Sequence, residues 1–293
     1  MTAISAPVPV PAHSVRTAKR PQRRPTWKTV TLAISAYVIA FLFVFPYLDM
    51  FITSLRPQDE LQTATILPHH YSWSSYATLW KTGLGTNLKV TILIAGGATL
   101  LVLLVATPAA YFTARHRFRG RMAFLILVLI TQMFQPTALL VGIYRQFVNF
   151  HMLNSVWALI LVNAGFNMAF AVWILNAYFG SIPRELEEAA MVEGSGRLGA
   201  LFRVTLPLAA PGVVTALVFT FIAAWNEFIV ALTLMTTPDK QPLTVAINGF
   251  IGAYNIEWQH LFAASVIATI PVIILFALIE RKVVSGLTAG SIK

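Results

Sequence analysis

The segment GSIPRELEEAAMVEGSGRLGALFRVTLP, Gly180–Pro207, lies between two long apolar segments and decides how the whole chain is interpreted. Its first half predicts a short helix, because Pro183 is tolerated in a first turn and glutamate favours the positive end of the helix dipole. Gly194 is suited to end this helix, since glycine adopts the left-handed C-terminal conformation without steric cost. The glutamates near the start of the helix are Glu185, Glu187 and Glu188.

The second half of this segment predicts another short helical run, Arg197–Val204, ended by Leu206-Pro207 because proline interrupts helical hydrogen bonding. In the first helix, Ala189 and Ala190 are small enough to let another surface approach closely. The segment is too charged to cross a bilayer. It therefore predicts a structured connection, outside the membrane, that makes a mechanical contact with another protein.

The composition of the chain indicates an integral membrane protein. Of its 293 residues, 57% are hydrophobic and only 11% are charged, and the mean hydropathy is +0.71. Soluble domains carry about 25% charged residues. The sequence contains no cysteine, which excludes a disulfide scaffold, thiolate catalysis and thiolate metal sites. The same composition excludes an intrinsically disordered or collagen-like chain.

Six mostly apolar segments are each long enough to cross a bilayer core, which takes about 20 helical residues. Five of them carry no charge, and the fifth in chain order is interrupted by Glu227. We therefore expect an all-α, polytopic membrane protein with six transmembrane helices. The segments are Thr29–Leu48, Val90–Ala114, Met122–Tyr144, Ser155–Phe179, Val213–Met235 and Leu261–Ile279.

The basic residues divide unequally between the two sides of this predicted topology. Sixteen of the 21 lie in the two terminal segments and in the second-to-third and fourth-to-fifth connections. Positive charge favours the cytoplasmic side, so both termini are predicted to be cytoplasmic, with Thr53–Leu88 and Thr236–His260 as outward loops. The net charge of +10 is thus an orientation signal, with membrane lipid as a minor partner and nucleic acid excluded. We expect residues 1–27 to form a basic, disordered cytoplasmic tail and residues 28–293 to form one transmembrane domain.

One pattern in the charged segment is specific to a family. Glu188-Ala-Ala is followed by Gly194 four positions on, then by nine other residues and Val204-Thr-Leu-Pro207. This pattern resembles the EAA motif of ABC-importer membrane subunits, and it departs from that motif only in Val204, where the family has Ile. Ala224–Phe228 and Gly286–Gly290 look like the carbohydrate-uptake branch and its MalG-like subunits. The resemblance covers roughly residues 28 to 293.

The resemblance implies a type I ABC-importer permease fold in a prokaryotic cell membrane. Its partners would be a second permease subunit, two ATPase subunits and an extracytoplasmic substrate-binding protein. The chain contains no GxxxxGK[ST] loop, so ATP and Mg are expected on the ATPase subunits, with no catalytic residue, cofactor or metal site on this chain. The residues implied in ATPase coupling are Glu188, Ala189, Ala190, Gly194, Leu206 and Pro207, and those implied in contact with the binding protein are Asn248, Gly249, Tyr254 and Asn255.

Polar residues inside the predicted membrane segments have two interpretations. Asn163 and Asn167 lie four apart on one face of the fourth segment, and Gln132 and Gln135 lie three apart in the third, just before Pro136. They could line a sugar pathway, or they could form hydrogen bonds between helices, as amides commonly do in membrane bundles. The candidate pathway residues are Asn163, Asn167, Trp225, Asn226 and Glu227.

The sequence leaves the substrate open. A di- or oligosaccharide such as maltose or trehalose is the favoured interpretation, and a polyol or a glycerol phosphodiester is the alternative within the same branch. An ion-coupled secondary transporter is less favoured, because internal repeats are absent and intramembrane titratable groups are few. A membrane-embedded enzyme would need His, Asp or Glu clustered at membrane depth, whereas the six His residues lie in the tail or near segment ends.

Overall fold

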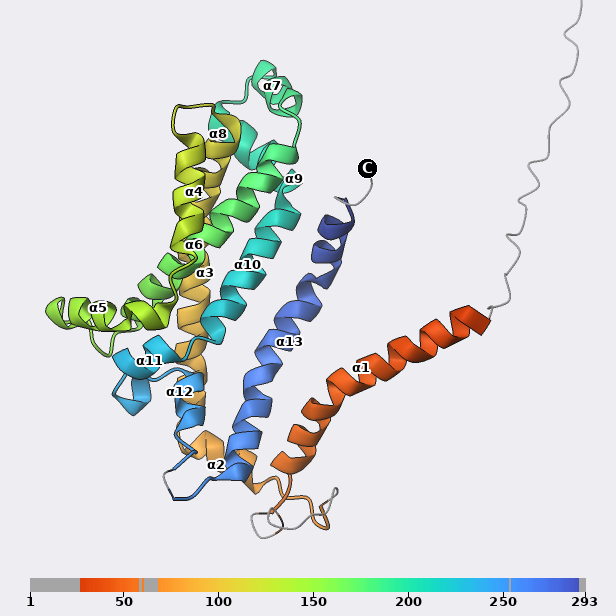
Figure 1. Cartoon of the computed structure of the whole chain (residues 1–293), viewed down its shortest axis with the longest axis vertical. Coiled ribbons are helices and arrows are strands. Elements are labelled where there is room, and N and C mark those ends of the chain that lie inside the picture. Colours follow the sequence, from red (N-terminus) through yellow and green to blue (C-terminus); the bar gives the residue numbers. More distant parts are fainter. Residues whose placement is uncertain (1–26, 58–59, 61–67, 253, 290–293) are drawn as a thin grey trace, which may run out of the picture. The chain divides into compact units, whose positions relative to one another are not determined.

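The computed structural model describes residues 27–57, 60, 68–252 and 254–289, with side chains described up to residue 279. These residues form helices and turns, apart from one isolated bridge between Ile251 and Ile256. The predicted disordered tail lies outside the described residues except for Trp27, which begins α1 (Figure 1). Residues before Tyr47 form a unit of their own, and Tyr47–Lys293 form a second, larger unit.

Within the described residues, four helices are long and apolar enough to cross a membrane, or up to six spans are present if each of two bent helix pairs counts as one. The four helices correspond to the first, second, fourth and sixth predicted segments. They are α1 (Trp27–Ser54), α3 (Leu84–Arg115), α6 (Val156–Ser181) and α13 (Trp258–Ala289).

The third predicted span, Met122–Tyr144, is not a single straight helix. The chain forms α4 (Arg121–Thr131) and α5 (Pro136–Asn149), which meet at an angle of 90°. Proline favours an extended conformation in the residue before it, and Gln135 accordingly has φ −73° and ψ 140°. Gln132 ends α4 and Gln135 precedes α5, so these two residues do not share a helix face.

The fifth predicted span, Val213–Met235, is also broken. α10 (Ala210–Trp225) ends before Asn226, and a short helix, α11 (Ile229–Leu234), follows. Glu227 lies at this break, where its carboxylate accepts hydrogen bonds from the first backbone N–H groups of α11. Its oxygens lie 2.7 Å from Val230 N and 2.9 Å from Ala231 N. A carboxylate in this position satisfies N–H groups that have no partner within the helix.

Leu206-Pro207 does not end the second helical run of the charged segment. α8 (Arg197–Ala200) continues through a π-helical turn, η2 (Leu201–Thr205), into α9 (Leu206–Leu208), and this run bends by 75° into α10. Proline is tolerated because it lies in the first turn of α9, where its missing N–H is not required. The predicted run therefore ends at Val204, four residues before the end of the observed run at Leu208.

α3, α6 and α10 form the packed centre of the larger unit. Their buried contact is rich in small residues such as Ala106, Ala110 and Ala171, which allow close approach of helix backbones. At Gly212 of α10, a Cβ would overlap the ring of Tyr178 in α6, so only glycine fits this contact. On the opposite side of α3, large apolar side chains are exposed, as expected for a lipid-facing surface. They include Leu93, Leu100 and Leu104.

The connections of the larger unit gather at opposite ends of this bundle (Figure 1). α7 (Glu185–Val192) and α8 lie at one end, which we call the α7 end. α2 (Ser74–Lys81) and α12 (Leu243–Asn248) lie at the other, the α12 end. The loop Thr53–Leu88 thus contains a short helix, as its length predicts. The predicted coupling segment and the last predicted outward loop lie far apart in the structure.

Candidate functional site

α7 is a short helix whose end is fixed by backbone hydrogen bonds. Gly194 follows the last residues of the helix with φ +92°, which confirms the left-handed terminator predicted from the sequence. Gly194 N–H donates to Met191 O over 3.1 Å, and Ser195 N–H donates to Ala190 O over 3.0 Å. This pair of bonds is the Schellman arrangement, which satisfies carbonyls left over at the end of a helix.

The residues predicted for ATPase coupling are accessible on α7. Glu188 and Ala189 are exposed, and Ala190 is half-buried. Farther along, Leu206 packs against the hydrophobic centre, while Pro207 is exposed at the bend. Large apolar side chains are also exposed on α7, α8 and η2 at the same end. They include Val192, Leu198 and Phe202, which are 89%, 71% and 61% exposed.

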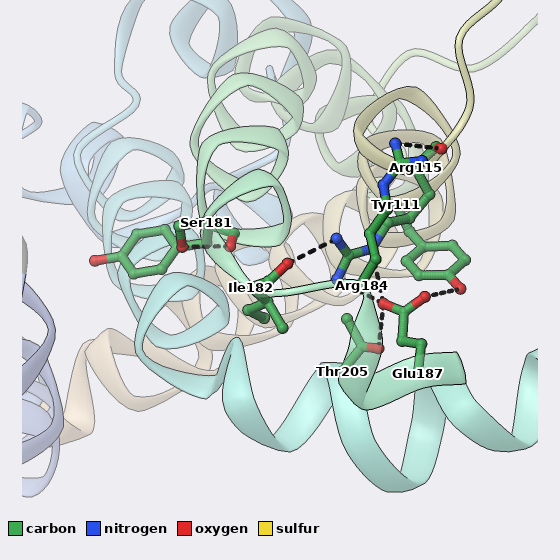
Figure 2. Close-up of polar contacts among 8 residues, drawn as sticks. Tyr111, Arg115, Ser181, Ile182, Arg184, Glu187 and Thr205 are labelled. Carbon is green, nitrogen blue, oxygen red and sulfur yellow. Dashed lines mark hydrogen bonds and ion pairs between the residues drawn. The ribbon is translucent and has the colours of Figure 1, made fainter. Parts of the chain in front are cut away.

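The adjacent glutamate, Glu187, is buried and bonded within the chain, a role that the sequence did not predict. Its Oε1 lies 2.7 Å from Arg115 Nε and 2.6 Å from Arg115 Nη2. Tyr111 Oη donates to its Oε2 over 3.0 Å, and Thr205 Oγ1 donates to Oε1 over 2.7 Å. We call Tyr111, Arg115, Glu187 and Thr205 the Glu187 cluster. Figure 2 shows these side chains converging on the carboxylate.

Arg115 also bonds to the backbone that leads into α7. Its Nη1 donates to Ile182 O over 2.8 Å, and Arg184 Nη2 donates in turn to Arg115 O over 2.8 Å (Figure 2). The end of α3 is therefore fastened to α7 and to the residues just before it. One signal for this role exists in the sequence: Tyr111 and Arg115 are four residues apart, and hence on one face, at the end of an otherwise apolar helix.

Three of the candidate pathway residues line one cavity. Asn163, Asn167 and Glu227 surround a volume of about 250 Å³, together with Gln132 and Gln135 from the break between α4 and α5. The amide groups already take part in local bonds, since Asn163 and Asn167 donate to Leu159 O and Asn163 O, and Gln132 donates to Phe166 O. The structure thus brings together polar groups from α4, α5, α6 and the α10–α11 break.

Trp225 and Asn226 lie at a different cavity, of about 290 Å³, which Thr244 and Thr269 also line. Trp225 is buried and stacks on Phe221, with ring centroids 5.5 Å apart. The five pathway candidates therefore do not form one site in this chain. Trp225 has the contacts of a packing residue, and its indole face is not open for a sugar ring in this arrangement.

The last predicted outward loop has a fastened base and an exposed tip. Asn87 Nδ2 donates to Pro238 O and Gln241 O over 3.0 and 2.7 Å, and Asn154 Oδ1 accepts from the backbone N–H of Thr236 over 2.7 Å. The tip turns back through a bond from Gly252 N–H to Asn255 O. All four predicted contact residues are exposed, with Tyr254 fully so; they are Asn248, Gly249, Tyr254 and Asn255.

Comparison with known proteins identifies the family of this chain. The family described as "Binding-protein-dependent transport system inner membrane component" matches residues 106–288. The chain belongs to this family. The match includes the whole segment Gly180–Pro207 and every member of the Glu187 cluster. As an inner membrane component of such a transport system, the chain is a multi-pass membrane protein and a transport subunit.

Individual relatives cover nearly all of this inner membrane component. The sulfoquinovosyl glycerol transport system permease protein SmoH of Agrobacterium fabrum is 35% identical over 263 residues, which are 89% of this chain and 92% of the relative. The trehalose/maltose transport system permease protein MalG of Thermococcus litoralis is 32% identical over 275 residues, covering 92% and 99%. These matches confirm the resemblance to ABC-importer permeases that the EAA motif indicated.

A solved structure supports the fold. A bacterial ABC transporter involved in the import of the acidic polysaccharide alginate contains a chain that matches with a TM-score of 0.75 and 24% identity. The match covers 86% of this chain and 95% of that chain. The predicted all-α permease fold of an ABC importer is confirmed, with the correction that the third and fifth predicted spans are interrupted.

Proposed function

We propose that this chain is one of two permease subunits that enclose the pathway of an ATP-driven carbohydrate importer. The observation that carries the proposal is the arrangement of α7. This helix stands at one end of the bundle with Glu188 exposed, while its neighbour Glu187 is bonded inside. A short helix held in this way on a membrane domain is suited to receive force from another protein.

The exposed side of α7 is the proposed contact with an ATPase subunit. The Glu188 carboxylate is available to a basic residue of that subunit, and such charge-assisted contacts contribute about 1.5–3 kcal/mol. Ala189 and Ala190 keep the contact close, and Val192 adds exposed apolar surface. ATP and Mg bind the two ATPase subunits, and this chain transmits the resulting movement through Gly194, Leu206 and Pro207.

The opposite end is the proposed contact with the extracytoplasmic substrate-binding protein. The tip of the last loop presents Asn248, Gly249, Tyr254 and Asn255 on a base that is fastened to the bundle. This assignment requires the α12 end to face outward and the α7 end to face the cytoplasm. The distribution of basic residues supports that orientation, with both termini in the cytoplasm.

A glycoside is the proposed substrate class. The names of two relatives contain trehalose/maltose and sulfoquinovosyl glycerol, which supports a sugar, with an α-linked glucose disaccharide favoured. The polar cavity at Gln132, Asn163 and Glu227 offers the amide and carboxylate groups that bond hydroxyls. The glycerol unit in one of these names keeps a glycerol phosphodiester or a polyol as the second candidate.

Purification and reconstitution test this proposal directly. The tagged chain is isolated from its native membrane, co-purifying subunits are identified, and the complex is placed in vesicles with its binding protein. We expect an ATPase and a second permease in the complex, and ATP-dependent uptake of labelled maltose or trehalose. A polyol and a glycerol phosphodiester are measured in parallel. Uptake driven by an ion gradient without ATP would contradict the proposal, and uptake of only the parallel solutes would correct its substrate.

A further inference from the structure

The Glu187 cluster connects α7 to a helix that is not its neighbour in the chain. α7 follows α6 and leads through α8 to α10, whereas Arg115 of α3 is 72 residues away from Glu187. We infer that the buried pair Glu187–Arg115 passes ATP-driven movement of α7 directly to α3. This inference rests on the proposed function, and it assigns to Glu187 a positioning role distinct from the contact made by Glu188.

The bonding of the Glu187 carboxylate supports this division of roles. Both of its oxygens accept bonds from inside the chain, from Tyr111, Arg115 and Thr205. The residue is only 7% exposed, so it is not available to a partner subunit. Thr205 lies in η2, the turn that leads to α10, so the same carboxylate also holds the far side of the charged segment.

α3 is suited to carry movement through the molecule. It is a continuous helix of 32 residues, which corresponds to about 48 Å at 1.5 Å per residue. Residues of α3 take part in each of three buried hydrophobic clusters described in the larger unit. At its other end, Asn87 bonds to Pro238 O and Gln241 O, and Thr91 Oγ1 accepts from Leu243 N–H over 2.7 Å. The helix thus joins α7 to the base of the last outward loop.

The energetics of a buried ion pair fit a geometric role better than a stabilising one. Burial of two charges has a desolvation cost that offsets most of their attraction, and apolar replacements are often as stable. What the pair provides here is a fixed direction: Arg115 donates through Nε to Glu187 Oε1 and through Nη1 to Ile182 O, while its Nη2 forms an ion pair with the same carboxylate oxygen. Glu187→Gln would keep the volume of the side chain and loosen this connection, and it would also leave the buried Arg115 charge without its partner, at a cost in stability.

The test uses the complete transporter in vesicles, with Glu187→Gln, Tyr111→Phe and the control Glu185→Gln. Glu185 lies on the same helix and is exposed. We expect Glu187→Gln to retain the ATPase subunits but to lower substrate transported per ATP hydrolysed by about tenfold, within the usual 5- to 150-fold range of coupling between sites. Tyr111→Phe keeps the ring beside Phe179 and removes one bond, so a smaller decrease is expected. Glu185→Gln should behave as wild type.

Three results would overturn the inference. Normal transport per ATP in assembled Glu187→Gln would show that the pair is only structural. Loss of the ATPase subunits, with normal coupling in the complexes that remain, would show that Glu187 acts in docking. If Glu187→Gln does not accumulate in the membrane, Tyr111→Phe and Thr205→Val provide the test, because each removes one hydrogen bond to the Glu187 carboxylate. Normal transport per ATP in both variants would contradict the inference. Absence of an ATPase from wild type and Glu185→Gln would instead refute the proposed function itself.

Discussion

Replacing Gly194 by valine tests whether the left-handed end of α7 is required for coupling. At φ +92°, a residue with a Cβ costs about 1–2 kcal/mol more than glycine. No atom beyond the immediate neighbours lies within 4 Å of the position of the new Cβ, so the cost comes from the backbone and not from a clash. A cost of this size lowers the equilibrium ratio of capped to uncapped helix ends by about 5- to 30-fold.

The matched control for this change is Gly196→Val. Gly196 also has open space around its Cβ position, but its φ of −67° and ψ of 166° suit any residue. In reconstituted vesicles, we expect Gly194→Val to lower transport per ATP, by at most the factor of about 5- to 30-fold by which the ratio of capped to uncapped ends falls. Gly196→Val should stay close to wild type, and Gly194→Asn should recover part of the loss because asparagine tolerates this conformation. Equal transport in the two valine variants would refute the reasoning.

Three further predictions concern the two ends of the bundle. Glu188→Lys should detach or uncouple the ATPase without preventing membrane insertion; co-purification of a normally stimulated ATPase would contradict this. Tyr254→Ala should reduce stimulation of ATP hydrolysis by the loaded binding protein while leaving stability unchanged, because the side chain is fully exposed; unchanged stimulation is the opposing result. In this cysteine-free chain, Tyr254→Cys should react with an impermeant reagent on intact cells and Ser195→Cys only after permeabilisation, and the reverse pattern would overturn the orientation.

Apolar runs predict four of the six spans because a helix of about 20 residues without charge has few other stable environments. The same reasoning fails where polar residues interrupt the run. Pro136 and Glu227 each mark a break, and both are visible in the sequence. An average of hydropathy over a window does not register them, since their neighbours are strongly apolar. The local chemistry of proline and of a capping carboxylate is the better guide at these positions.

The candidate site is predictable where its geometry is local. Gly194 follows from the rules that end a helix, and these rules act over about six residues. Glu187 is different, because its partner Arg115 is 72 residues away in sequence. The positive-inside rule already accounts for a basic residue at position 115, so the sequence gives no reason to pair it with Glu187. The pathway residues show the same limit: Asn163 and Asn167 share a face as predicted, while Trp225 is separated from them by the break in the fifth span.

The different roles of Glu187 and Glu188 follow from helix geometry. Successive residues on an α-helix point about 100° apart, since one turn takes 3.6 residues. When α7 lies across the end of the bundle, two consecutive glutamates therefore cannot both point directly at the bundle, and here Glu187 is buried while Glu188 is exposed. On the inner side, Arg115 pairs with the charge of Glu187 and Tyr111 donates a hydrogen bond to it, whereas Glu188 stays exposed. The two adjacent glutamates therefore supply an internal attachment and an exposed carboxylate, so force applied at the proposed Glu188 contact would act on a helix that α3 already holds.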